Sequence, residues 1–77
     1  MFEKLRDKIT EYVEVNRDEI LPQSRFVEDL GFTSYDFMSM VGDLEEEFGI
    51  EVDEQAITEI RDVQGAATYI EKLRKNS

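Results

Sequence analysis

The sequence contains no cysteine and no histidine, and these two absences exclude most self-contained chemistry. Without cysteine there is neither a disulfide framework nor a thiolate metal site. Without histidine the commonest general base and metal ligand is missing. We therefore do not expect an enzyme that supplies its own acid, base or nucleophile.

Long apolar runs are also missing. No stretch reaches the roughly 18 residues that a membrane-spanning helix needs. The first ten residues alternate charged and apolar side chains instead of forming a signal-peptide core. We expect a soluble, cytoplasmic protein without membrane insertion. Its 77 residues form one domain, residues 1–77, with a thin core, because so short a chain buries only about 60 to 65% of its unfolded surface.

Basic residues are scarce and unevenly placed. Nineteen acidic residues face nine basic ones, and residues 26–60 hold eleven acids and no base. The resulting negative net charge would repel the phosphates of a nucleic-acid backbone, so nucleic acid is not an expected partner. Apolar residues interleave the acidic segment throughout, which indicates the acidic outer face of a folded structure rather than a disordered tail. Such a face attracts a basic partner over a distance.

Apolar residues recur at three- and four-residue steps in two long segments and predict amphipathic helices. The first helix begins at Phe2 and ends near Val15. The second runs from about Ser34 to Phe48, and Gly49 stands at the expected C-terminal position. The inward stripe of this second helix comprises Phe37, Met40, Val41, Leu44 and Phe48.

Two further helices complete the prediction. A short one covers residues 54–60 behind Asp53 as its cap, and a last one starts at Val63 behind Asp62. The last helix closes on basic residues that suit a helix C-terminus, namely Lys72, Arg74 and Lys75. Residues 16–33 form a long loop or a short turn of their own. Its apolar residues are expected to anchor it in the core, namely Ile20, Phe26, Val27 and Leu30. The fold class is all-α, a small four-helix bundle of three longer helices and one short helix, with a long loop between helices one and two.

The start of the second helix carries a candidate attachment point. Thr33 followed by Asp36 fits a capping box, which makes Ser34 the first helical residue. Its hydroxyl then lies beside unpaired N–H groups at the positive end of the helix dipole, a place that favours a bound or attached phosphate. Spacing alone gives more weight to the simpler alternative that Ser34 is an ordinary polar residue at a helix start.

The outward face of this helix combines apolar and acidic residues. Tyr35 and Met38 lie beside Ser34 and are ringed by carboxylates, a pattern typical of a small docking patch. Alternatively, Met38 lines the edge of the core and the acids only solvate the surface. No segment has the alternating oxygens, sixth glycine and twelfth glutamate of a calcium loop, so no dedicated metal site is expected.

Several motifs together resemble one known family over nearly the whole chain. They are Phe26-Val27-Glu28-Asp29-Leu30-Gly31, then Ser34, then Leu44-Glu45-Glu46-Glu47-Phe48, and finally Asp62-Val63-Gln64 with Ala66, Tyr69 and Ile70. The chain resembles the acyl carrier proteins of bacterial fatty-acid synthesis. The resemblance implies that a phosphopantetheinyl transferase attaches 4'-phosphopantetheine to Ser34, and that the thiol of this arm carries acyl intermediates as thioesters. The chain itself would be a non-catalytic carrier.

The resemblance also implies two groups of site residues. The acyl chain would lie in a pocket formed by Met38, Leu44, Phe48, Val52, Ile57, Ile60 and Ala66. Partner enzymes would dock through Tyr35, Asp36, Met38, Asp43, Glu46 and Glu47. The expected partners are the transferase and acyl-processing enzymes with basic docking surfaces. We expect a monomer.

The sequence departs from the family pattern around the serine. The usual Asp-Ser-Leu is Thr33-Ser34-Tyr35 here, so the carboxylate before the serine is lost while the cap is kept. Ser39 stands where an acid is common and Gly42 where a larger apolar residue is common. These changes indicate a dedicated pathway instead of, or beside, bulk fatty-acid synthesis. The alternatives are a carrier for a polyketide, non-ribosomal peptide or aminoacyl pathway, and an unmodified acidic interaction module.

Overall fold

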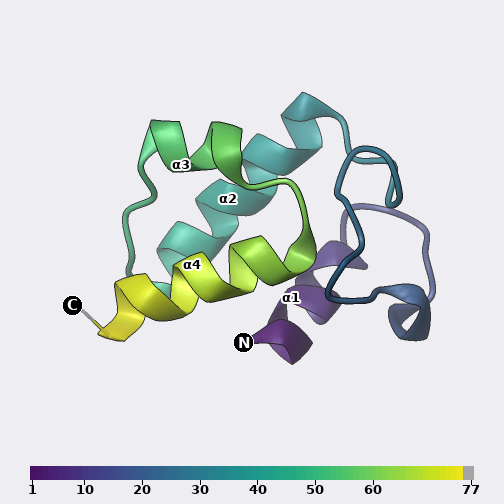
Figure 1. Cartoon of the computed structure of the whole chain (residues 1–77), viewed down its shortest axis with the longest axis horizontal. Coiled ribbons are helices and arrows are strands. Elements are labelled where there is room, and N and C mark those ends of the chain that lie inside the picture. The colour runs from purple at the N-terminus through teal and green to yellow at the C-terminus, as the bar shows by residue number, and fades with distance from the viewer. Residues whose placement is uncertain (76–77) are drawn as a thin grey trace.

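Helices supply the regular structure of residues 1–75, the part of the chain that this computed structural model describes. The elements are α1 (Phe2–Ile9), the 3₁₀ helix η1 (Arg17–Glu19), α2 (Ser34–Phe48), α3 (Glu54–Glu59) and α4 (Val63–Lys75). Figure 1 shows α4 running across the front of the bundle, with α2 behind it, α3 above it and the long loop at one end. The prediction of an all-α four-helix bundle with a long first loop is confirmed.

The first helix is shorter than its apolar pattern predicts. The prediction that it ends near Val15 is wrong, since α1 ends at Ile9. After that residue the N–H groups of Glu11 and Tyr12 bond to carbonyls three residues back, so the backbone tightens into a turn. The part that remains helical is well anchored, because both Leu5 and Ile9 are fully buried.

The long loop contributes a large share of the core. Ile20, Phe26 and Leu30 are buried as predicted, and Phe32 joins them at 2% exposure. Val27 was predicted to anchor the loop in the core as well, but this prediction is wrong, since its side chain is 60% exposed. It directly follows the buried Phe26 in a turn, which the N–H groups of Asp29 and Leu30 close by bonding to the carbonyl of Arg25, and its side chain points away from the core. The loop also contains a short helical turn, η1, which Arg17 ties to α1 through Glu3 and Asp7.

Backbone hydrogen bonds fix the loop against the start of α4. The N–H of Phe26 donates to the carbonyl of Arg61 at 3.0 Å, and the N–H of Val63 donates to the carbonyl of Ser24 at 3.0 Å. An isolated bridge pairs Arg25 with Asp62. These contacts place the loop, the end of α3 and the first turn of α4 side by side, and they explain why residues so far apart form one wall of the cleft described below.

The helix ends follow the predicted caps. The Thr33 side chain accepts from the Asp36 N–H at 3.1 Å and the Asp36 carboxylate accepts from the Thr33 N–H at 3.3 Å, a complete capping box. Gly49 ends α2 with a φ of 64°, in the left-handed region that glycine adopts freely. Asp53 caps α3, and Asp62 accepts from the N–H of Gly65 in the first turn of α4.

One hydrophobic core joins the loop to α1, α2 and α4. Its buried members are Leu5, Ile9, Ile20, Phe26, Leu30, Phe32, Met40, Leu44, Ile50, Val63, Ala66, Ala67 and Ile70. The helix α3 supplies none of them, and its inward residue Ile57 is only partly buried. We conclude that α3 is the least firmly packed helix of the bundle.

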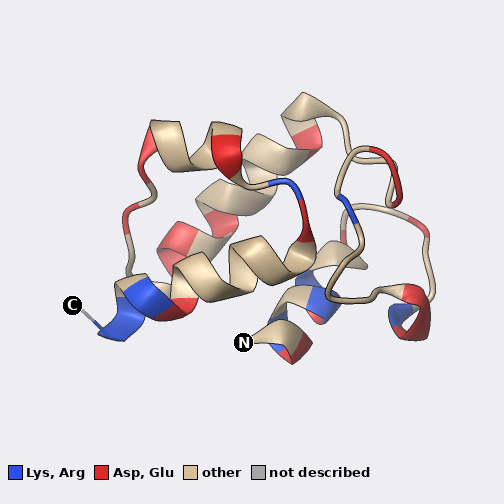
Figure 2. Cartoon of the chain, viewed as in Figure 1, with Lys and Arg blue, Asp and Glu red and all other residues tan. Residues whose placement is uncertain are grey.

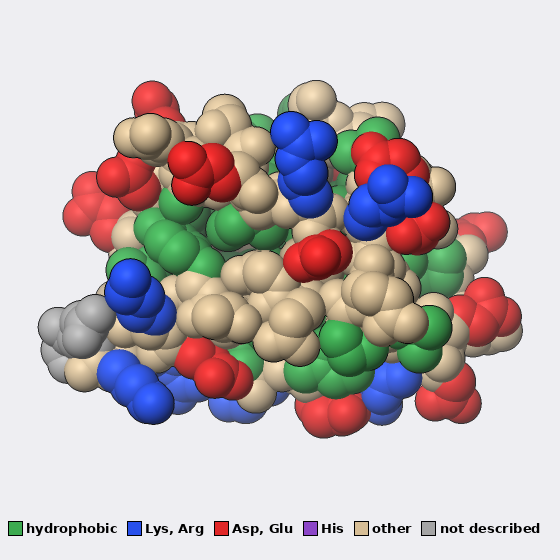
Figure 3. All heavy atoms as spheres, viewed as in Figure 1, with side chains coloured by type: hydrophobic (Ala, Val, Ile, Leu, Met, Phe, Trp, Pro, Cys, Tyr) green, Lys and Arg blue, Asp and Glu red, His purple; other side chains and the backbone are tan. Residues whose placement is uncertain are grey.

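The two signs of charge are unevenly distributed over the molecule, although α1 carries both. Figure 2 shows acidic residues along α2 and α3, whereas basic residues gather on α1 and at the C-terminal end of α4. In the space-filling view of Figure 3, hydrophobic side chains are visible in a hollow between α3 and α4. The predicted concentration of acids on the second helix and beyond is therefore an outward-facing surface.

Candidate functional site

Ser34 is exposed and is the first residue of α2. Thr33 occupies the N-cap position and takes up the N–H of Asp36. Within residues 1–75 the N–H groups of Ser34 and Tyr35 have no hydrogen-bond partner in the protein, as expected at a helix start. The hydroxyl therefore stands at an electropositive helix end, open to a reacting group.

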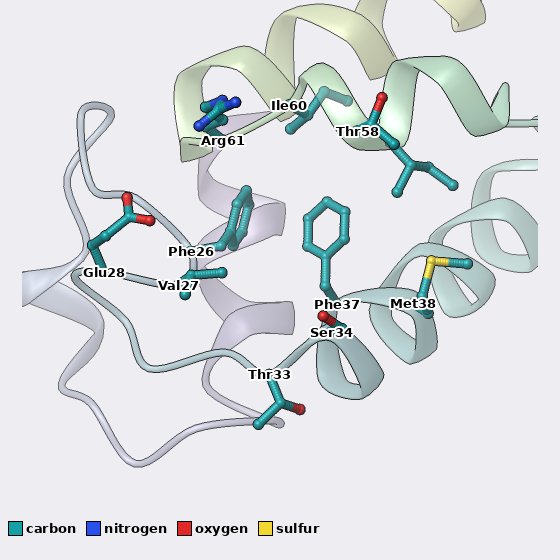
Figure 4. Close-up of a pocket in the computed structure, with 11 residues that line it drawn as sticks. Phe26, Val27, Glu28, Thr33, Ser34, Phe37, Met38, Thr58, Ile60 and Arg61 are labelled. Atoms are coloured by element: carbon teal, nitrogen blue, oxygen red, sulfur yellow. The ribbon is translucent and has the colours of Figure 1, made fainter.

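A cleft of about 430 Å³ opens beside this hydroxyl. Figure 4 shows Ser34 at one side of the cleft and Arg61 across it, with the rings of Phe26 and Phe37 between them. The loop contributes the wall with Val27 and Glu28, α2 contributes Met38, and α3 with the segment after it contributes Ile57, Thr58, Ile60 and Arg61. The cleft is mainly apolar inside and carries charged groups at its rim.

Aromatic contacts fix the floor of the cleft. The ring of Phe26 lies 5.2 Å from that of Phe37 and 5.4 Å from that of Phe32, the latter pair in an edge-to-face arrangement. Tyr12 extends the row at 6.2 Å from Phe32. Such pairs add to the stability that burial provides. They hold the first turn of α2 against the loop, so the position of Ser34 is set by packing on both sides.

The acyl-pocket residues predicted from the sequence do not line one cavity. Met38, Ile57 and Ile60 border the open cleft. A second, smaller cavity of about 20 Å³ lies between α2, α3 and α4 and is lined by Leu44, Val52, Ile57, Ile60 and Ala66 among others. That volume has room for about one water molecule. The interior of the bundle therefore has no room for an acyl chain in this structure.

Phe48 is not part of either cavity. Its ring lies at the last turn of α2 near two cations, with Lys4 Nζ at 5.4 Å and the Arg74 guanidinium carbon at 4.9 Å from the ring centre. Both contacts are within the range of cation–π interactions. Sequence analysis also missed Phe37 and Arg61 as cleft residues. The spacing of Phe37, three residues after Ser34, assigned it to the core alone.

The predicted docking residues divide into free and internally bonded groups. Tyr35 and Met38 are 81% and 52% exposed, and Glu46 is exposed as well. Asp36 is engaged in the capping box. Two further acids are held by the α1 side of the molecule. Asp43 accepts a hydrogen bond from the Tyr12 hydroxyl and Glu47 pairs with Lys8 at 3.5 Å.

The contact between Tyr12 and Asp43 also changes an ionisation equilibrium. Hydrogen bonding to the carboxylate, assisted by burial, raises the pKa of Tyr12 to about 12, because the phenol must lose the donated proton to ionise. The phenol is therefore a stable hydrogen-bond donor at neutral pH. Asp43 has an intramolecular partner that an incoming basic residue would have to displace.

Other kinds of site find little support in the described part of the chain. Residues 1–75 contain no group of three acidic side chains arranged to hold a metal ion. None of the helices there combines the length and the apolar character that crossing a membrane requires.

Comparisons with known proteins agree with this geometry. The protein family described as "Phosphopantetheine attachment site" matches residues 3–70. An acyl carrier protein of Campylobacter hominis is 38% identical over 76 residues, which is 99% of this chain and 96% of that protein. An acyl carrier protein of Solidesulfovibrio magneticus is 37% identical over 72 residues, with 94% and 92% covered.

A solved structure supports the same conclusion. It describes the acyl carrier protein of Enterococcus faecalis and superposes with a TM-score of 0.81 at 28% identity, over 94% of this chain and 91% of that one. Fold and site thus define a small helical carrier domain with an exposed serine beside a cleft. The chain belongs to the acyl carrier protein family, whose members are non-catalytic and are substrates of a phosphopantetheinyl transferase.

Membership in this family means that the chain carries covalent 4'-phosphopantetheine, to which acyl groups are attached. The residues present fit such an arm. An exposed hydroxyl, two N–H groups without partners and an adjoining apolar cleft are the features that a phosphodiester-linked chain requires. When bound, the arm supplies the thiol that this cysteine-free sequence lacks.

Proposed function

We propose that Ser34 is the attachment residue of the 4'-phosphopantetheine arm and that the protein carries acyl intermediates of fatty-acid synthesis. The observation that supports this most is the exposed hydroxyl at the first residue of α2, directly on the wall of the 430 Å³ cleft. The curated relatives at 37 and 38% identity carry the name acyl carrier protein, which supports the same function.

The residues around Ser34 each have a role in this proposal. The capping box of Thr33 and Asp36 fixes the helix start, so the hydroxyl is presented in one orientation. The N–H groups of Ser34 and Tyr35 stabilise the negative charge of a phosphodiester by about 0.3–1 kcal/mol at an exposed helix end. Since the sequence has no histidine to act as a general base, the transferase supplies the chemistry of attachment.

The cleft receives the arm and the first part of the acyl chain. A long chain needs more room than the 20 Å³ interior cavity offers. Ile57 and Ile60 line both cavities and belong to α3 and its C-terminal end. Because α3 contributes no fully buried side chain, moving it aside costs little buried area. We therefore expect long acyl chains to enter by displacing α3.

Partner enzymes dock on the outward face of α2 in this proposal. Tyr35 and Met38 offer apolar contact next to the arm, and Glu46 offers a free carboxylate. Asp36, Asp43 and Glu47 contribute negative potential while keeping their internal partners. A partner with an apolar recess and surrounding Lys or Arg side chains fits this surface. The monomeric state and the cytoplasmic location stay predictions.

Intact-protein mass spectrometry tests the attachment. The wild type is incubated with coenzyme A and a phosphopantetheinyl transferase, and should gain the mass of one arm. Ser34→Ala should gain nothing, whereas the matched control Ser39→Ala, five residues further along α2, should be modified fully. An unmodified wild type under active transferase would instead favour the acidic interaction module.

A second experiment separates the possible pathways. The loaded protein is recovered from extracts of its own cells, and the thioester-bound group is released and identified. Fatty acyl groups support the proposal. Polyketide, peptidyl or aminoacyl groups would assign the chain to a dedicated pathway and would leave the carrier role intact.

A further inference from the structure

Three of the four acids in the C-terminal half of α2 already have partners inside the molecule. Asp43 accepts a hydrogen bond from the Tyr12 hydroxyl, and Glu47 pairs with Lys8 at 3.5 Å. The third acid, Glu45, accepts a hydrogen bond from a backbone N–H at 2.8 Å. A basic partner that docks on this half of the helix therefore meets donors that belong to the same chain.

The turn after α1 holds Tyr12 in place for its bond to Asp43. The N–H of Tyr12 donates to the carbonyl of Ile9 at 3.0 Å, where the helix has just ended. The ring packs against the core and lies 6.2 Å from that of Phe32. Because backbone and ring are already fixed, the hydroxyl loses little conformational freedom when it binds the carboxylate. Tyr12 is thus a preorganised donor.

An internal donor lowers the affinity of an exposed acid for a partner. Asp43 and Glu47 are both exposed, so an incoming cation can reach them. A net hydrogen bond of ordinary strength leaves its acceptor free for only about a third to a tenth of the time. The dissociation constant of a ligand that needs the free acceptor rises by the same factor, about three- to tenfold. The two internal contacts therefore oppose docking without blocking it.

The bond to Tyr12 does not oppose all cations equally. The phenol bonds to Oδ2 of Asp43, and Oδ1 has no donor within residues 1–75. A lysine ammonium acts as a point charge and can use Oδ1 alone. A guanidinium prefers two parallel bonds, one to each carboxylate oxygen. An arginine therefore competes with the phenol for Asp43, whereas a lysine does not have to.

From these contacts we infer that Tyr12 and Lys8 compete with partner enzymes for Asp43 and Glu47, and that Tyr12 selects against partners that bring an arginine to Asp43. This inference rests on the proposed docking of basic partners on α2. It adds two specificity-determining residues that lie outside the docking helix. Partners that bind only the N-terminal half of α2, around Tyr35 and Met38, escape this competition.

NMR titrations of the full chain with two basic peptides test the inference. The peptides are hexa-arginine and hexa-lysine, which carry equal charge, and the dissociation constants are read from the backbone amide shifts of Asp43 and Glu47 at low ionic strength. Hexa-arginine should bind Tyr12→Phe about three- to tenfold more tightly than it binds the wild type. The affinity for hexa-lysine should change by less than about twofold.

A second variant tests the competition without altering an aromatic ring. Lys8→Gln and Lys4→Gln remove the same charge from α1, but Lys4 lies over the Phe48 ring and pairs with no acid within residues 1–75. Lys8→Gln should therefore tighten the binding of hexa-arginine more than Lys4→Gln does, by up to about fivefold.

Tyr69→Phe is the control for the loss of a phenol hydroxyl. The Tyr69 hydroxyl accepts a hydrogen bond from the N–H of Asp53 and bonds to no acid within residues 1–75. This variant should keep the wild-type affinity for both peptides. The spread of the amide resonances without peptide shows in each case that the variant is folded.

Four results would contradict the inference. Equal affinities of the wild type and folded Tyr12→Phe for hexa-arginine would show that the phenol does not compete. An equal gain for both peptides would show that it does not distinguish arginine from lysine. An equal gain in Tyr69→Phe would assign the effect to a loosened bundle. Peptides that shift no amide of α2 in any form would remove the proposed docking surface itself, which is a separate failure.

Discussion

The hydroxyl of Tyr12 donates a hydrogen bond to the carboxylate of Asp43 and so joins the turn after α1 to the middle of α2. A second contact joins the same region of the chain to α2: Lys8, four residues before Tyr12, pairs with Glu47, four residues after Asp43. The acidic surface of α2 is therefore used partly for internal contacts. The proposed docking residues without such an internal contact are Tyr35 and Met38 beside Ser34 and Glu46 near the other end of α2, and all three are exposed.

Replacing the Tyr12 hydroxyl should weaken the bundle. Tyr12→Phe leaves Asp43 without its donor and should lower the free energy of unfolding by about 1 kcal/mol, measured by urea denaturation. Tyr35→Phe is the matched control, because that side chain is 81% exposed and makes no hydrogen bond within residues 1–75. Equal stabilities for the two variants would show that the bond to Asp43 contributes nothing.

The same contact predicts a pH dependence at alkaline pH. The pKa of Tyr12 is raised from 10.0 to about 12 in the folded state. The stabilisation is therefore complete below pH 10 and is lost as the pH rises towards 12. Ultraviolet titration of the phenols should show one group ionising near pH 12, and this group should disappear in Tyr12→Phe. Its persistence in the variant would assign it to another tyrosine.

The N-cap of α2 should contribute measurably to stability. Thr33→Ala removes the acceptor for the Asp36 N–H and should cost about 1 kcal/mol. Thr33→Ser keeps the hydroxyl and should retain most of the wild-type stability. Thermal or urea unfolding of the three proteins decides this, and an alanine variant as stable as the serine variant would contradict a capping role for Thr33.

Gly42 offers a route to a more stable protein. A Cβ built at this position meets nothing within 4 Å, and its backbone is helical. Gly42→Ala should therefore raise the free energy of unfolding by roughly 1 kcal/mol. Gly49→Ala should do the opposite, because its φ of 64° is strained for alanine. Destabilisation by Gly42→Ala would indicate a close contact that this structure does not contain.

The density of acids should make stability depend on salt. Residues 26–60 hold eleven acids and no base, so these charges repel one another at low ionic strength. The melting temperature should rise as sodium chloride screens this repulsion, whose range is about 8 Å at physiological ionic strength. Glu46→Gln should raise the low-salt value and reduce the salt dependence. A melting temperature that is flat across salt would rule out significant repulsion.

Local rules were enough to predict much of the fold. The capping box of Thr33 and Asp36, the glycine at 49 and the apolar stripe of α2 all depend on residues close in sequence, and the structure confirms them. The end of α1 was missed because apolar periodicity continues through Val13 while the backbone tightens after Ile9. Periodicity records which side chains face inward and does not record how tightly the backbone turns.

The cleft was harder to predict than the helices. It depends on which residues of the loop, α2 and α3 meet in space, and no pattern along the chain reports this. Val27 reads as a core residue by composition, yet it lies 60% exposed on the cleft wall. No local pattern around Arg61 predicts a place in the cleft. It lies opposite Ser34 because its carbonyl accepts a hydrogen bond from the Phe26 N–H.

Locating the arm on the chain tests the central proposal most directly. Trypsin should release residues 26–61 as one peptide, because the only basic residue within it is its last, and this peptide contains the aliphatic hydroxyls of Thr33, Ser34, Ser39 and Thr58 and the phenol of Tyr35. Fragmentation of this peptide from the protein treated with transferase should place one 4'-phosphopantetheine on Ser34. An arm on any other residue, or none with an active transferase, would contradict the account.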